Sequence, residues 1–131
     1  MNLRLRDRLL FVDLVVVHGG QRCEVTDVLV DTGSAGTVVS ADLVGEIGLR
    51  AGPGDRLHVL HGVGGEEVVF TKRVEAIEIG GHLIRDVRIE VGAMDYGYAM
   101  NGILGLDLLR RAGAVIDLGT MQLAWGTVPS P

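Results

Sequence analysis

Cysteine is nearly absent from this chain of 131 residues, which contains Cys23 alone. A lone cysteine forms no disulfide within the chain and cannot build a four-ligand zinc–thiolate site. Because disulfides mark oxidising compartments, we expect a reduced, soluble environment and assign the protein to the cytoplasm. The four histidines include no pair at metal-ligand spacing, so we expect neither a metal nor another cofactor.

The chain also lacks a long apolar run and a surplus of basic residues. Its longest apolar stretch, Leu9–Val17, is interrupted by Asp13 and is far shorter than the roughly 20 residues that a membrane helix needs. Arg4, Arg6 and Arg8 precede this stretch as in a secretory signal, but no cleavage site of small residues follows, so we expect no signal peptide. The net charge of −5 argues against nucleic acid as a partner, and we expect no membrane partner.

Proline and aromatic residues are scarce, whereas glycine is abundant. The chain has 3 prolines, 4% aromatic residues and 20 glycines, with 47% hydrophobic residues among which valine is frequent. The hydrophobic content excludes intrinsic disorder, and the valines and glycines favour short strands joined by tight turns. We therefore predict a single all-β domain over 1–131, with its core at about 10–125 and one or two short helices.

Four hairpins are predicted from pairs of apolar runs separated by turn residues. Glycine pairs accept the positive φ of a tight turn at little cost, and they occur at 19–20 and 80–81. The segment 74–79 is predicted to be a new strand that begins after the second hairpin has ended at Thr71. The predicted hairpins cover residues 10–30, 57–71, 74–91 and 114–125.

Two short helices are predicted between these hairpins. The first covers 41–47, with Ser40 as its N-cap and Gly48 as its stop, and the second covers 105–111. Hairpin, loop of small residues, short helix and hairpin thus follow one another twice along the chain. This order predicts a pseudo-duplicated fold.

A carboxylate is predicted at the end of an apolar strand in the first of these loops. The run Asp31-Thr32-Gly33-Ser34 directly follows Val28-Leu29-Val30. Such a loop can present the carboxylate, while Gly33 allows close backbone approach and the hydroxyl of Thr32 can form hydrogen bonds. The same residues taken alone also fit an Asx-turn that leaves a strand.

In its context, this loop resembles the active-site loop of the retropepsin-like aspartic proteases, the single-domain relatives of pepsin. The apolar-apolar-Gly motif of that family, which lies beside the active-site loop and opens a short helix, is matched by Ile103-Leu104-Gly105. Its glycine-rich flap is matched by His61-Gly62-Val63-Gly64-Gly65, and the hairpin that closes its barrel by residues 116–123. These motifs occur in the family's order over residues 10–125.

The resemblance implies a closed β-barrel of hairpins and the activity of an aspartic endopeptidase, a hydrolase. In that chemistry two carboxylates share one proton across a water, because two like charges a few ångström apart do not both ionise. This chain has one Asp-Thr-Gly, so the resemblance implies a homodimer that acts on polypeptide substrates. The implied roles are catalysis by Asp31, Thr32 and Gly33, substrate binding by the flap at His61, Gly62, Val63, Gly64 and Gly65, and support by Ser34, Ile103, Leu104 and Gly105.

An alternative of another class is an inactive module of the same fold that binds extended peptide or only mediates dimerisation. Asp107 and Asp117 are weaker candidates for catalysis, since the first fits the first turn of a helix and the second a strand or turn. Viral retropepsins carry an arginine after the apolar-apolar-Gly motif and an acid after the catalytic loop. This chain has Leu106 and Ala35 there, and in this respect resembles the cellular and bacterial members.

Overall fold

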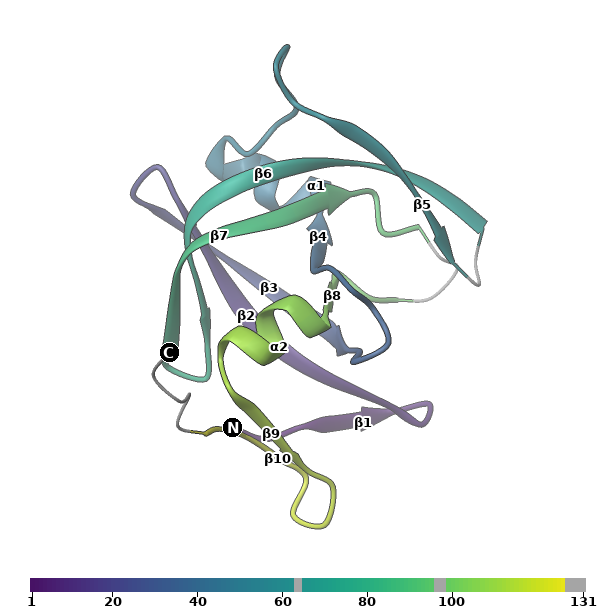
Figure 1. Ribbon diagram of the computed structural model, residues 1–131, viewed down its shortest axis with the longest axis vertical. Helices are drawn as coiled ribbons and strands as arrows, with labels where there is room; N and C mark the ends of the chain where they lie inside the picture. The colour runs from purple at the N-terminus through teal and green to yellow at the C-terminus, as the bar shows by residue number, and fades with distance from the viewer. Residues whose placement is uncertain (63–64, 96–98, 127–131) are drawn as a thin grey trace.

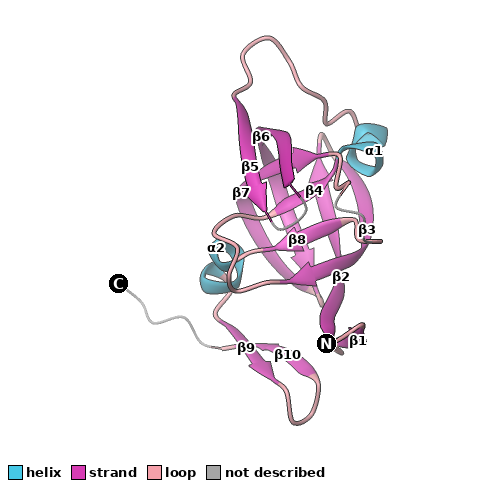
Figure 2. Ribbon diagram, turned by 90° about the vertical axis from the view of Figure 1, so that its right-hand side faces the viewer, coloured by secondary structure: helices cyan, strands magenta, loops and turns pink. Residues whose placement is uncertain are grey.

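Strands make up most of the computed structural model, which describes residues 1–62, 65–95 and 99–126 (Figures 1 and 2). None of the helices in these ranges is long and apolar enough to cross a membrane. The helices are α1 (Ala41–Val44), the 3-10 helix η1 (Gly45–Ile47) and α2 (Leu106–Arg111). The strands are β1 (Arg4–Arg6), β2 (Leu9–His18), β3 (Gln21–Val30), β4 (Val38–Ser40), β5 (Leu57–Gly62), β6 (Gly65–Ile79), β7 (His82–Gly92), β8 (Gly102–Leu104), β9 (Ala114–Asp117) and β10 (Gln122–Trp125).

Eight of these strands form one sheet in the order β1-β2-β3-β8-β4-β7-β6-β5. β2 also pairs with β6, from Val15 opposite Glu78 to Val17 opposite Ala76, so the pairings from β2 round to β6 form a closed circuit. β9 and β10 form a separate two-stranded sheet. Figure 2 shows the main sheet curving between α1 and α2, with the β9–β10 hairpin extending beyond it.

The main core consists of aliphatic side chains on one face of this curved sheet. Alternate residues of a strand point to opposite faces, and in β2 the buried side chains of Val12, Leu14 and Val16 belong to this core. A smaller cluster lies on the opposite face of the β4–β8 region. Its buried members are Val38, Val69 and Met94, with Met100 and Ile103 packed against them.

The turns confirm the hairpin predictions at both glycine pairs. Gly19 and Gly20 have φ of 58° and 74°, and Gly80 and Gly81 have φ of 56° and 81°. The predicted break between residues 71 and 74 is wrong, because β6 runs without interruption from Gly65 to Ile79. Residues 71–74 include no glycine, proline or asparagine that would turn the chain, so the strand continues and pairs with β5 near one end and with β2 near the other.

Both short helices lie where the sequence predicts them. α1 and η1 together cover 41–47, and Gly48 ends them in the left-handed conformation with φ of 82°. Ser40 occupies the N-cap position, although its side chain makes no capping hydrogen bond. α2 follows Gly105 and carries Arg110 and Arg111 in its last turn, where cations favour the helix dipole.

Candidate active site

The Asp31 loop begins where β3 ends, and β8 fixes its starting point. β3 and β8 are parallel, with Leu29 opposite Ile103 and Val30 opposite Leu104. The backbone N–H of Asp31 continues this ladder by donating to the carbonyl oxygen of Leu104 at 3.0 Å. β8 in turn lies between β3 and β4, so both ends of the loop are bound to the same short strand.

The carboxylate of Asp31 is held by the turn that follows it. The N–H of Gly33 donates to Oδ1 of Asp31 at 2.9 Å, and the N–H of Ser34 donates to the carbonyl oxygen of Asp31 at 3.2 Å. Asp31 is half-buried. Thr32 beside it is exposed, and its hydroxyl forms no hydrogen bond with the described residues. Asp31 therefore forms an Asx-turn, and the same turn holds its carboxylate in place at the end of β3.

The helix α2 packs against the second half of the loop through backbone atoms. The N–H of Leu106 donates to the carbonyl oxygen of Ser34 at 2.7 Å. The hydroxyl of Ser34 donates to the carbonyl oxygen of Gly36 at 2.9 Å. A Cβ on Gly105 would lie 2.2 Å from the carbonyl oxygen of Gly36. The apolar-apolar-Gly segment and the Asp31 loop are thus in direct contact, and glycine is required where they meet.

The buried residue Thr37, which the sequence analysis does not single out, connects the exit of the Asp31 loop to the start of α2. It is 1% exposed, and its Oγ1 accepts from the N–H of Gly105 at 3.0 Å and donates to Oδ1 of Asp107 at 2.8 Å. Oδ1 of Asp107 also accepts from the N–H of Leu108 at 2.8 Å. Asp107 therefore supports the first turn of α2 and, through Thr37, the exit of the loop. The sequence offers no signal for this contact, which spans 70 positions.

Asp117 is the last residue of β9, at the start of the turn that leads to β10. Its Oδ1 accepts from the N–H of Thr120 at 3.0 Å, and hydrogen bonds from Thr120 lower the pKa of this carboxyl. No hydrogen bond between described residues joins Asp117 to the Asp31 loop. Its role in the structure is that of a turn residue.

The predicted flap corresponds to the end of the β5–β6 hairpin at which β5 leads into β6. His61 pairs with Glu66, and Gly62 pairs with Gly65. Val63 and Gly64 lie outside the described residues. Figure 1 shows this end of the hairpin on the same side of the molecule as the loop between β3 and β4. The small apolar cluster with Val38 and Ile103 includes Val69 of β6, so it links the hairpin to the strands that carry the loop.

Comparison with known proteins agrees with this arrangement. The family model described as "gag-polyprotein putative aspartyl protease" matches residues 19–111, which include the Asp31 loop, the β5–β6 hairpin and α2. The chain belongs to this family. Among solved structures, the crystal structure of a retropepsin-like aspartic protease from Rickettsia conorii matches with a TM-score of 0.66 and 19% identity, covering 94% of this chain and 95% of that one. A comparison with curated protein sequences finds no match.

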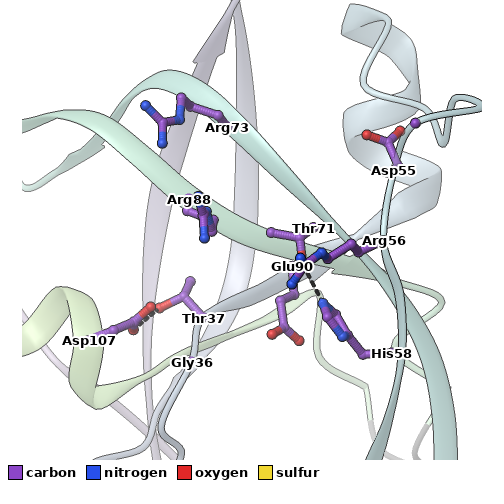
Figure 3. Close-up of a pocket in the computed structure, with 11 residues that line it drawn as sticks. Gly36, Thr37, Asp55, Arg56, His58, Thr71, Arg73, Arg88, Glu90 and Asp107 are labelled. Carbon is purple, nitrogen blue, oxygen red and sulfur yellow. Dashed lines mark hydrogen bonds between the residues drawn. The ribbon is translucent and has the colours of Figure 1, made fainter.

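The matched structure shows that the chain has the retropepsin fold, an all-β fold with few short helices. Beside the Asp31 loop, this retropepsin-like chain has a polar pocket of about 680 Å³ (Figure 3). It lies between Gly36 and Thr37 at the loop exit and the side chains of β5, β6 and β7. Glu90 of β7 lines it, and Oε2 of this carboxyl is buried without a hydrogen-bond partner among the described residues.

Glu90 gives a prediction for the pH dependence of stability. Burial raises the pKa of its carboxyl, the charge of Asp107 raises it further, and His58 opposes the shift. As the pH rises through the ordinary range of glutamate, the unfolded chain loses this proton before the folded chain does, and so the free energy of unfolding falls. We expect Glu90→Gln to raise Tm relative to the wild type at pH 7.5, and to do so less at pH 4.

The matched control is Asp117→Asn, since the pKa of Asp117 is lowered rather than raised. Its wild-type carboxylate stabilises the fold above the ordinary range of aspartate and loses that effect as the pH falls. Thermal melts of the three proteins at both pH values should therefore show opposite trends for the two variants. A Glu90→Gln effect that is equal at both pH values, or larger at pH 4, would contradict the raised pKa.

Proposed function

We propose that this protein is an aspartic endopeptidase that works as a homodimer, with one Asp31 from each copy activating a water for peptide-bond hydrolysis. The observation that carries the proposal is the geometry of Asp31. Its backbone is tied to Leu104 of β8 and its Oδ1 to the N–H of Gly33, so the carboxylate is held at a fixed place at the end of β3. Ser34 and Gly105 support the loop from the side of α2.

A second Asp31 would complete the chemistry. Of two adjacent carboxylates, one keeps the proton. The ionised carboxylate takes a proton from the water, whose oxygen attacks the peptide carbon, while the protonated carboxyl donates to the carbonyl oxygen. Breakdown of the tetrahedral intermediate breaks the C–N bond, and the amine leaves with a proton returned from the pair. The water is consumed, and the step needs no cofactor.

The two weaker candidates for catalysis, Asp107 and Asp117, are already engaged in hydrogen bonds within the chain. The carboxylate of Asp107 is held by Thr37 and by the N–H of Leu108, and that of Asp117 by Thr120. Neither forms a hydrogen bond with the carboxylate of Asp31 in the described part of the chain, which supports a second copy as the source of the partner carboxylate. The exposed hydroxyl of Thr32 is free to bond to the loop of that copy.

The β5–β6 hairpin is proposed to act as the flap, with His61, Gly62, Val63, Gly64 and Gly65 over the substrate. An extended peptide has unpaired backbone groups, and a hairpin and a loop can bond to them from either side. Ile103 and Met100, the partly buried members of the small apolar cluster, would supply contacts for apolar side chains near the scissile bond. Closure of the hairpin would exclude water from the carboxylate pair.

Dependence of activity on protein concentration tests this function. Because only the dimer has two copies of Asp31, hydrolysis per chain should rise with concentration and level off where sedimentation shows complete dimerisation. The assay uses a fluorogenic peptide library, and analytical ultracentrifugation is performed on the same samples. Constant hydrolysis per chain across the monomer–dimer transition would contradict a shared site. A dimer that binds peptides without cleaving them would be the inactive module instead.

A further inference from the structure

The polar pocket beside the Asp31 loop lies on one face of the sheet that also carries the apolar cluster. Thr71 of β6 stands opposite Glu90 of β7, and Arg73 stands opposite Arg88. Side chains of residues that face each other across two strands lie on the same side of the sheet. Val69 precedes Thr71 by two positions and therefore shares this side, where it belongs to the apolar cluster.

This register places the pocket on the same side of the sheet as the apolar cluster beside the loop. An extended peptide places alternate side chains on the same side at intervals of about 6.5–7 Å. A substrate that runs along this face from Asp31 would contact the cluster at its partly buried member Ile103 and then reach the pocket between Thr37 and Thr71. The pocket is thus positioned to contact a side chain some residues away from the scissile bond.

Two guanidinium groups that line the pocket have no acidic partner among the described residues. Arg56 and Arg88 both line it, and their side chains form no hydrogen bond or ion pair with the part of the chain that the structure describes. Figure 3 shows Arg56 extending toward Thr71 and Arg88 extending over Thr37. The third guanidinium, that of Arg73, points away from these two and lies 3.4 Å from Asp86.

The acidic residues of the pocket form no ion pair with Arg56 or Arg88 in the part of the chain that the structure describes. Asp55 pairs with Lys72 at 2.7 Å, and Asp107 is held by Thr37. Glu90 is left with a buried oxygen that has no partner among the described residues, and burial raises the pKa of this carboxyl. Because the guanidinium groups of Arg56 and Arg88 have no partner among the described residues, their N–H donors remain available to an anionic ligand.

We propose that this pocket is a specificity site in which Arg56 and Arg88 bind an anionic side chain of the substrate, either a carboxylate or a phosphorylated serine. Guanidinium groups bind both kinds of anion through charge-assisted, often bidentate hydrogen bonds. The proposal rests on the proposed peptidase function, because the pocket is reached along the path of an extended substrate. It makes the enzyme selective for apolar residues near the cut and for an acidic residue farther along.

Peptide binding to the Asp31→Asn variant tests the pocket without any need for catalysis. The probes are fluorescein-labelled decapeptides with an apolar centre, in which one position, moved along the chain, holds Glu, phosphoserine, Gln or Lys. Fluorescence anisotropy should show about tenfold tighter binding of the Glu or phosphoserine peptide than of the Gln peptide at one position. The stronger of these two peptides identifies which anion the pocket prefers.

Charge variants then assign the preference to the pocket. Arg56→Gln and Arg88→Gln, each added to Asp31→Asn, should reduce the preference for the anionic peptide to within about twofold and leave binding of the Gln peptide unchanged. Arg85→Gln is the matched control, because Arg85 is exposed on the same strand β7 and does not line the pocket. Its removal lowers the charge of the chain equally and should leave the preference intact.

The proposal is overturned if the anionic preference survives in the Arg56→Gln, Arg88→Gln double variant, if Lys is preferred to Gln, or if none of the peptides binds. The wild-type chain separates this failure from failure of the proposed function. Cleavage of the Gln and Glu peptides with equal kcat/KM would refute the pocket and keep the peptidase. Anion-selective binding without cleavage by the wild type would keep the pocket and refute the peptidase.

Discussion

Replacing Asp31 with asparagine is expected to lower kcat/KM by about a thousandfold or more, because a general acid–base pair contributes about 10²–10⁴-fold and here both of its members are lost. The fold should remain intact. The side-chain oxygen of asparagine can still accept the hydrogen bond that Gly33 N–H gives to Oδ1 of Asp31, and the backbone bond to Leu104 is unaffected. The measurement is hydrolysis of a fluorogenic peptide, with circular dichroism and sedimentation of the same sample.

The matched control for this substitution is Asp117→Asn, which makes the same chemical change in the β9–β10 turn. It should keep full activity at a temperature well below its Tm. Undiminished hydrolysis by a correctly folded Asp31→Asn chain would refute the assigned role of Asp31.

Mixed dimers extend the test from the residue to the shared site. A dimer of one wild-type and one Asp31→Asn chain has a single Asp31 carboxylate in the shared site and should be inactive. Adding an excess of the variant to a fixed amount of wild type should therefore suppress hydrolysis as subunits exchange. Activity that is independent of the added variant would mean that each chain forms a complete site alone.

The sequence predicts those parts of the fold that depend on local backbone preferences. Gly19-Gly20 and Gly80-Gly81 adopt the positive φ that their turns require, and Gly48 ends the first helical segment in the same region. Glycine adopts positive φ at less cost than any other residue, so its position in the sequence is informative. The Asp31 loop is predictable for a related reason, since a polar segment of small residues follows a buried strand.

The parts that the sequence could not predict depend on pairing between distant strands. The insertion of β8 between β3 and β4 brings Thr37 to Asp107, and no local pattern specifies which buried threonine will meet which helix. The polar pocket requires the register of β6 against β7, which puts Thr71 opposite Glu90. A shift of one residue would turn these side chains to the other face, and the sequence alone does not fix that choice.

The contact between Gly105 and the Asp31 loop predicts the largest effect on stability. A Cβ at position 105 would lie 2.2 Å from the carbonyl oxygen of Gly36 and 2.9 Å from that of Ser34. Both are backbone atoms that cannot rotate away, so the loop and the start of α2 would have to separate. We expect Gly105→Ala to lower the free energy of unfolding by about 3 kcal/mol, the upper part of the range for overpacked sites.

The same substitution should also reduce activity in the molecules that remain folded. Separation of α2 from the loop weakens the bond from Leu106 N–H to Ser34, and Ser34 is itself bonded to Asp31. Since misplacement of a reacting group by about 1 Å can cost about 10²-fold in rate, kcat/KM should fall by about that factor at a temperature where the variant is folded. Thermal melts and peptide hydrolysis measure the two effects separately.

Gly36→Ala is the matched control, because it adds a methyl group to the other side of the same contact. A Cβ there would meet only Oε1 of Glu90 at 3.8 Å, an ordinary van der Waals distance, and Gly36 does not have positive φ. This variant should melt within a few degrees of the wild type and keep most of its activity. If Gly105→Ala is no less stable than Gly36→Ala, the close approach of the two backbones is not what holds the loop, and the support assigned to Gly105 fails with it.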